Sequence, residues 1–210
     1  LKAEHDLGAV GPLLLFPGSG RVQHLGVTFL PGALAHHLYS NFPSSHPLVH
    51  KDRRVKALTG AALMIPQTLF RDCGGFHHEY RNGWEDVDLC LEIGKRGRGL
   101  RCVPESLVYH LTSQTSGRFT EETQNHSILL RRQGEAMRPD MHLHGLRDGY
   151  KPHLTPCLQL YLTQDEETER KLDAMPLEEM NETAIQKLLN AHPFWFKGYD
   201  RLASFLEKME

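Results

Sequence analysis

The chain has 210 residues, which suffices for one substantial domain with a smaller appendage. Its formal charge of −2 gives no electrostatic reason to expect binding to nucleic acid or to an anionic membrane. Hydrophobic residues make up 40% of the chain, yet no apolar run approaches the roughly 18 residues that a membrane-spanning helix needs. No secretory signal is visible, so the sequence predicts a cytoplasmic protein, peripheral at most to the inner face of a membrane.

Neither the cysteines nor the histidines form a recognisable metal-binding motif. The four cysteines contain no CxxC pair, which argues against a zinc site built on paired thiolates. We therefore expect reduced and mostly buried thiols. The 14 histidines are scattered along the chain, and none belongs to an HExxH motif.

The first part of the chain alternates strand patterns with turns. Residues 10–16 form a short apolar run that ends in a Pro-Gly-Ser-Gly turn, and residues 22–29 show a second strand pattern. Residues 31–54 have no period and are rich in His, Pro, Ser and Asn; a loop of that length is usually functional. Residues 55–65 are the most apolar stretch and are compatible with a buried strand.

Helical patterns follow. Pro66 suits the first position of a helix that ends at Gly74–Gly75, with Leu69, Phe70 and Cys73 on its inner side. The clearest helix covers residues 85–96, because its apolar residues share one face and its two ends carry charges that complement the helix dipole. Two short strands are expected at 100–103 and 107–110, so the order of elements predicts an α/β layered domain.

After about residue 150 the pattern becomes helical. Apolar residues at helical spacing follow Pro176, and a second helix is expected from Pro193. We therefore divide the chain into a domain at 1–150 and a linker with a helical tail at 151–210. A single helical hairpin is the simpler interpretation of this tail. A repeat-like array, along which a partner peptide would lie, is the alternative.

The densest chemical signal lies in residues 74–90, where an acidic triplet opens a helix directly after a glycine-rich, aromatic turn. This arrangement puts carboxylates at a loop-to-helix junction, where they can face a cleft. The positive end of the helix favours an ionised Asp86, which could then accept a proton. Plain capping of the helix explains the same acidic residues on their chemistry alone.

This segment resembles the GGFDE…EDVDLC stretch of family 2 glycosyltransferases, the rhamnosyltransferase-like group in particular. Further segments resemble that family in the same order, and the similarity covers roughly residues 5–150. They are residues 7–12 (GAVGP), 22–27 (IQHAGV), 58–65 (VTGACLLIRR), 103–110 (P…VYH) and the Ser-rich stretch 113–118. The resemblance implies a GT-A mixed-sheet domain that lacks its N-terminal nucleotide-binding half, with a helical hairpin at its C-terminus.

The resemblance also implies roles for individual residues. Asp86 corresponds to the general base that takes the proton from the acceptor hydroxyl, and Glu85 would help to hold the acceptor. The turn of Thr59, Gly60 and Ala61 would lie near the donor sugar, where small residues permit close approach of the backbone.

Three residues keep an alternative interpretation. His110 matches a histidine that completes the metal site in related GT-A enzymes; otherwise it is a surface histidine at a strand end. Trp84 either stacks on the acceptor sugar or belongs to the core. Arg118 either reaches the diphosphate or is a solvated loop arginine.

The sequence departs from the family pattern in two places. His77 and His78 stand where the family usually has Asp-Glu. No DxD motif precedes the matched segments, and in GT-A enzymes that motif holds the cation and the diphosphate. Asp86-Val87-Asp88 is formally a DxD, but we reject it as the donor motif because carboxylates two apart on a helix point about 200° apart.

These observations predict a metal-dependent, inverting glycosyltransferase, although the retaining GalNAc-transferases share the surrounding pattern. The resemblance implies Mn²⁺ or Mg²⁺ as cofactor and a UDP, dTDP or GDP sugar as donor. The acceptor would be a saccharide, a lipid-linked saccharide or a protein, and the function polysaccharide biosynthesis. The alternative is a non-catalytic binding or scaffold module whose helical tail docks a protein partner.

Overall fold

The computed structural model describes residues 4–111, 121–176 and 180–207. The chain forms two compact units, Leu1–Asp140 and Met141–Glu210. The division near residue 150 that the sequence suggested falls within the second unit, between its first helix and its first strand.

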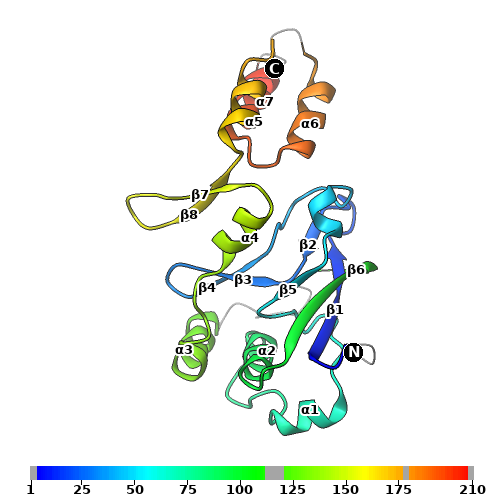
Figure 1. Ribbon diagram of the computed structural model, residues 1–210, viewed down its shortest axis with the longest axis vertical. Helices are drawn as coiled ribbons and strands as arrows, with labels where there is room; N and C mark the ends of the chain where they lie inside the picture. Colours follow the sequence, from blue (N-terminus) through cyan, green and yellow to red (C-terminus); the bar gives the residue numbers. More distant parts are fainter. Residues whose placement is uncertain (1–3, 112–120, 177–179, 208–210) are drawn as a thin grey trace. The chain divides into compact units, whose positions relative to one another are not determined.

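A four-stranded mixed sheet with the order β2-β1-β6-β5 forms the centre of the first unit. Strands β1 and β6 run parallel side by side, whereas β2 and β5 pair antiparallel with their neighbours (Figure 1). Helices accompany this sheet, so the fold is mixed α/β, as the sequence predicted, and is compatible with the GT-A class. The strands are β1 (Leu7–Leu15), β2 (Val22–His24), β5 (Arg53–Val55) and β6 (Gly99–Tyr109).

The two strands expected at 100–103 and 107–110 are one continuous strand, β6. The intervening residues do not end it, because the register with β1 shifts at this point. Pro12 pairs with Val103, and the next residue, Leu13, pairs with Leu107. A bulge of this kind accommodates extra residues in one strand without breaking the sheet.

The strand expected at 22–29 is split in two at Gly26. This glycine has a φ of +102°, and a Cβ at its position would lie 2.3 Å from Cγ1 of Val55, so a side chain does not fit. The chain turns here and forms a separate hairpin. The long loop expected at 31–54 therefore contains structure, namely half of this hairpin, one 3-10 helix and β5. The elements concerned are β3 (Val27–Leu30), β4 (Leu34–His37) and η1 (Pro47–His50).

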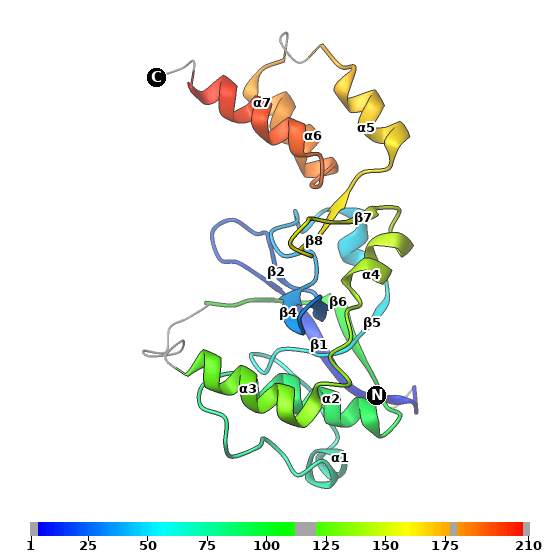
Figure 2. The ribbon, with the colours of Figure 1, turned by 90° about the vertical axis from the view of Figure 1, so that its left-hand side faces the viewer.

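Helix α2 (Glu85–Lys95) agrees closely with the helix that the sequence predicted. It packs against β1 and β6, and α3 (Glu122–Gln133) lies beside it (Figure 2). The approach to β1 requires Gly8, since a Cβ there would lie 2.4 Å from Cγ2 of Ile93. Helix α3 was not predicted from the sequence. Helix α1 (Gln67–Asp72) follows Pro66 as expected, but none of its own residues is fully buried.

The second unit contains a two-stranded hairpin and four helices among the described residues. Its core is formed by Leu172, Ile185, Leu189 and the fully buried Trp195. The two predicted tail helices are present as α6 and α7, while α5 was not expected. Leu177, one of the apolar residues at helical spacing after Pro176, lies outside the described residues. The elements are α4 (Met141–Arg147), β7 (Lys151–Leu154), β8 (Leu160–Thr163), α5 (Glu166–Asp173), α6 (Glu182–Ala191) and α7 (Phe196–Glu207).

All four cysteines are free thiols. Cys90 and Cys102 are buried, and burial raises the pKa of each thiol to about 12. Cys157 is exposed and Cys73 is half-buried. Within the described parts of the chain, no helix is both long and apolar enough to cross a membrane.

Candidate functional site

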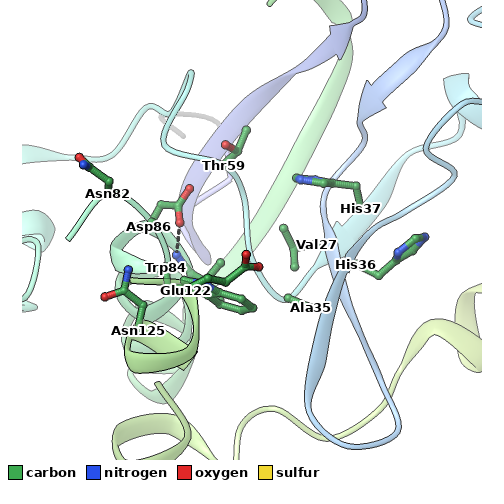
Figure 3. A pocket seen from close by; sticks show the side chains of 12 residues that line it. Val27, Ala35, His36, His37, Thr59, Asn82, Trp84, Asp86, Glu122 and Asn125 are labelled. Carbon is green, nitrogen blue, oxygen red and sulfur yellow. Dashed lines mark hydrogen bonds between the residues drawn. The ribbon is translucent and has the colours of Figure 1, made fainter. Parts of the chain in front are cut away.

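Asp86, the second residue of α2, lines a cavity of about 230 Å³ in the first unit. One side of the cavity is formed by the loop before α2 and the start of α3, and the other side by the β3–β4 hairpin (Figure 3). The lining residues are Val27, Ala35, His36, His37, Thr59, Asn82, Gly83, Trp84, Asp86, Val87, Glu122 and Asn125. The structure therefore places the residue expected to be the base in a concave site.

The Asp86 carboxylate is held by backbone donors from two segments. Its Oδ2 accepts a hydrogen bond from the N–H of Gly60 at 2.6 Å, and its Oδ1 accepts one from the N–H of Val87 at 2.8 Å. A carboxylate offers about four lone-pair positions, so these two bonds leave acceptor capacity unused. The group is thus both fixed in place and able to accept a further hydrogen bond from a ligand in the cavity.

The turn of Thr59, Gly60 and Ala61 lies directly beside Asp86. Thr59 lines the cavity, and its Oγ1 accepts a hydrogen bond from the N–H of Ala61 at 3.3 Å. A Cβ at position 60 would lie 3.2 Å from Cβ of Asp86, which is a tight contact. The hydrogen bond from Gly60 to Asp86 therefore joins two candidate site segments that are 26 residues apart in the sequence.

Trp84 and Glu85 have different surroundings although they are neighbours. Trp84 lines the cavity, and its ring centroid lies 5.3 Å from that of His126. Its φ of +76° is uncommon for a residue with a side chain. Glu85 is turned back to its own loop, where its Oε2 accepts a hydrogen bond from the N–H of Gly83 at 2.8 Å. Glu85 is not among the cavity residues.

Asp88 serves a different purpose from Asp86. It is 2% exposed and accepts hydrogen bonds from Nε and Nη2 of Arg132 and from Nε2 of Gln133, at 3.0, 3.1 and 2.9 Å. These bonds tie α2 to α3, on the opposite side of the helix from the cavity. The helical spacing argument against a DxD function for Asp86 and Asp88 agrees with this arrangement.

His110 follows the end of β6 and pairs with Gln23. Its Nδ1 lies 2.7 Å from Oε1 of Gln23, and Nε2 of Gln23 donates to the carbonyl of His110 at 2.9 Å. Because an amide oxygen only accepts, Nδ1 carries the proton in neutral His110, and Nε2 keeps the lone pair that a metal needs. The described residues contain no group of three or more His, Cys, Asp or Glu that could hold a metal ion. His110 is therefore a single candidate ligand. Arg118 lies outside the described residues.

The sequence reading missed several cavity residues, namely His36, His37, Asn82, Glu122 and Asn125. The two histidines lie in the loop 31–54, whose length had marked it as functional without identifying any residue. Asn125 is buried, and its side chain bonds the backbone N–H and carbonyl of Arg81, which fixes the loop that carries Trp84.

His24 was also overlooked. It lies on β2 with 1% of its surface exposed, and its Nε2 accepts the N–H of Thr59 at 3.3 Å. Its Nδ1 lies 2.8 Å from Nδ1 of His37, which lines the cavity. The sequence showed this histidine only as one letter of a strand motif.

These features define a mixed α/β domain with a fixed carboxylate at a loop-to-helix junction that faces a polar and aromatic cavity. No family model matches the chain. The uncharacterized protein y4gI of Sinorhizobium fredii (strain NBRC 101917 / NGR234) is 30% identical over 160 residues, which make up 73% of this chain and 17% of y4gI.

A second relative is the O-antigen biosynthesis protein RfbC of Myxococcus xanthus. It is 31% identical over 110 residues, which make up 50% of this chain and 8% of RfbC. The chain therefore spans less than a fifth of the length of either relative. Across 50% of its length, the chain is thus similar to a protein named for O-antigen biosynthesis.

Proposed function

We propose that this chain forms the acceptor side of a glycosyltransferase, which moves a sugar from a nucleoside-diphosphate sugar to a hydroxyl group. The observation that carries the proposal is the position of Asp86, a carboxylate held by Gly60 and Val87 while it lines a cavity. The similarity to RfbC and the family resemblance of the sequence support the same class of reaction.

In the proposed reaction, the acceptor hydroxyl oxygen attacks the anomeric carbon of the donor sugar, and Asp86 takes the hydroxyl proton. The bond from the anomeric carbon to the diphosphate oxygen breaks, and the nucleoside diphosphate leaves with the electron pair. A single displacement of this kind inverts the anomeric centre. A positioned general base contributes roughly 10²- to 10⁴-fold to such a reaction.

The other cavity residues suit a saccharide acceptor. The ring of Trp84 offers an apolar face on which a sugar ring can stack, and Asn82 and Glu122 offer hydrogen-bonding groups for its hydroxyls. The acceptor in this proposal is a free saccharide, a lipid-linked saccharide or a glycosylated protein.

A divalent cation, Mn²⁺ or Mg²⁺, is part of the proposal. When bound, such an ion stabilises the charge on the departing diphosphate. His110 would contribute one ligand through Nε2, and the remaining ligands would come from protein groups outside the described residues and from the donor.

The test compares Asp86→Asn with Asp72→Asn in the full-length protein that contains this chain. Asp72 is an exposed aspartate at the end of α1 and does not line the cavity. We expect transfer from the best of a panel of UDP, dTDP and GDP sugars to fall by roughly 10²- to 10⁴-fold in Asp86→Asn alone. Binding of the nucleotide sugar should persist. Unchanged turnover in Asp86→Asn would remove this residue from the mechanism.

A non-catalytic binding module is the second candidate. It is favoured by the two backbone hydrogen bonds of Asp86, because they would explain a carboxylate at the start of a helix without any reaction. Titration of the full-length protein with the same nucleotide sugars and Mn²⁺ separates the two. Metal-dependent binding of one sugar supports the transferase, and absence of binding across the panel supports the binding module.

A further inference from the structure

We propose that His24 is a positioning residue: together with His37 it forms a directional hydrogen-bond relay that holds the Thr59–Gly60 turn against Asp86. The inference deepens the proposed function and rests on it for the role of Asp86. The relay itself consists of contacts between described residues, so it is testable without any assay of sugar transfer.

The direction of the relay follows from counting protons. The backbone N–H of Thr59 can only donate, so Nε2 of His24, 3.3 Å away, must be unprotonated. A neutral imidazole then carries its proton on Nδ1. That proton points to Nδ1 of His37 at 2.8 Å, which must accept it. The planes of the two rings are inclined at 79°, and their centroids lie 5.0 Å apart. The remaining ring proton of His37 is consequently on Nε2.

The relay extends to the carboxylate through a single residue, Thr59. Thr59 and Gly60 are consecutive, and their two N–H groups are anchored by His24 on one side and by Asp86 on the other. Loss of the acceptor at Nε2 of His24 frees one of the two anchors of this turn. The expected consequence is a displaced Gly60 N–H and a less well fixed Asp86 carboxylate.

One extra proton anywhere in the pair breaks the relay. If His24 gains it, Nε2 becomes a donor that faces the N–H of Thr59. If His37 gains it on Nδ1, His24 must accept there and move its own proton to Nε2, with the same result. His37 lines the cavity, so a proton that it gains there is in reach of any ligand bound in the cavity. The relay thus connects the protonation state at the cavity wall to the turn beside Asp86.

The surroundings of His24 keep its imidazole neutral near pH 7. Burial, followed by the neighbouring His37 on β4 and His110 after β6, lowers the pKa of His24 well below its ordinary value. Asp86 reaches the other end of the turn, through Gly60. Because the pKa of the folded state is lower than that of the unfolded state, the contribution to stability is present above about pH 6.5 and is lost as the pH falls.

The first test is nitrogen NMR of the histidine rings in the 210-residue chain at neutral pH. We expect His24 to carry its proton on Nδ1 and to have an unprotonated Nε2. A proton on Nε2 of His24 overturns the relay, whatever the protein catalyses.

The second test compares His24→Gln, which keeps an acceptor directed at Thr59, with His24→Leu, which does not. His78→Gln, at an exposed position on the loop before α2, is the matched control. We expect amide exchange of Thr59 to accelerate by about tenfold in His24→Leu, the fold-change that corresponds to the loss of one hydrogen bond. Exchange should stay close to the wild-type rate in the other two variants. If His24→Leu does not fold, an NMR titration with acid decides instead. The amide chemical shifts of Thr59 and Gly60 should then change with pH in the wild type and not in His24→Gln.

Sugar transfer gives the link to the proposed function. In His24→Gln, transfer at neutral pH should be retained. The part of the fall in transfer rate at low pH that is caused by protonation of His24 should disappear. If the transfer rate falls equally with decreasing pH in the wild type and in His24→Gln, the positioning role is overturned. If no transfer is found in any variant while the NMR results hold, the relay stands and the proposed function fails.

Discussion

The backbone N–H of Gly60 donates to Oδ2 of Asp86 across 2.6 Å, and this bond joins the Thr59–Ala61 turn to the start of α2. The contact is close because position 60 has no side chain. A Cβ there would lie 3.2 Å from Cβ and 3.4 Å from Oδ2 of Asp86. The absence of a side chain at position 60 therefore permits the hydrogen bond to the Asp86 carboxylate.

Replacement of Gly60 by alanine should disturb the site more than the fold. Since Gly60 does not have a left-handed backbone, alanine is tolerated locally, and we expect the free energy of unfolding to change by less than about 1 kcal/mol. Asp86 must move by a few tenths of an ångström, so transfer should fall by roughly tenfold or more. The measurements are urea unfolding and the transfer assay.

Gly94→Ala is the control for this substitution. Gly94 is an exposed residue of α2, with nothing within 4 Å of an added Cβ. Alanine should stabilise the helix by about 0.4–1 kcal/mol and leave transfer unchanged. Equal effects of the two substitutions on transfer would contradict a special role for position 60.

Replacement of Asp88 by alanine should destabilise the first unit. The carboxylate is buried and accepts three hydrogen bonds from Arg132 and Gln133, so its loss leaves a partly buried guanidinium unpaired. We expect a loss of about 2–4 kcal/mol in the free energy of unfolding. Urea unfolding measures this loss, with Asp72→Ala as a control that should change stability by less than about 0.5 kcal/mol. A loss that small in Asp88→Ala would show that the α2–α3 contact is not held by this network.

Acid should weaken the second unit through Asp173. Its carboxylate bonds Lys197 and accepts the indole Nε1–H of Trp195 at 3.0 Å, and these bonds, Lys197 first, lower the pKa of Asp173. A lowered pKa in the folded state contributes stability above the unfolded value of 3.8, which is lost as the pH falls below it.

The fluorescence of Trp195 reports this change, because the chain has two tryptophans and Trp84→Phe removes the other. Unfolding of the second unit by urea, followed in that variant, should require less denaturant at pH 3 than at pH 5. The difference should shrink when Asp173→Asn is added. An undiminished acid effect in the combined variant would assign the pH dependence to other groups.

The sequence predicted the elements whose pattern is local. Helix α2 has an apolar face and charged ends, and it was placed to within a residue at its C-terminus. The acidic triplet after the glycine-rich turn drew attention to Asp86, and the family resemblance implied both its role and that of the turn at 59–61. The structure places these two segments in contact.

Features that depend on contacts between distant segments could not be predicted in the same way. The bulge that makes β6 continuous depends on its register with β1, and the break at Gly26 depends on Val55. Helix α3 has a weak apolar face because buried polar residues, Asn125 and Gln133, hold it in place. His24 shows no chemical signal until folding brings Thr59 and His37 to either side of its ring.

The opposite orientations of Asp86 and Asp88 restrict how the first unit can respond to a ligand. Any rotation of α2 about its axis would pull Asp88 away from Arg132 and Gln133, which are fixed on α3. The hydrogen bonds of Asp88 thus prevent α2 from rotating about its own axis. Adjustment around a bound molecule is left to the β3–β4 hairpin, so structural differences between free and occupied protein should concentrate there.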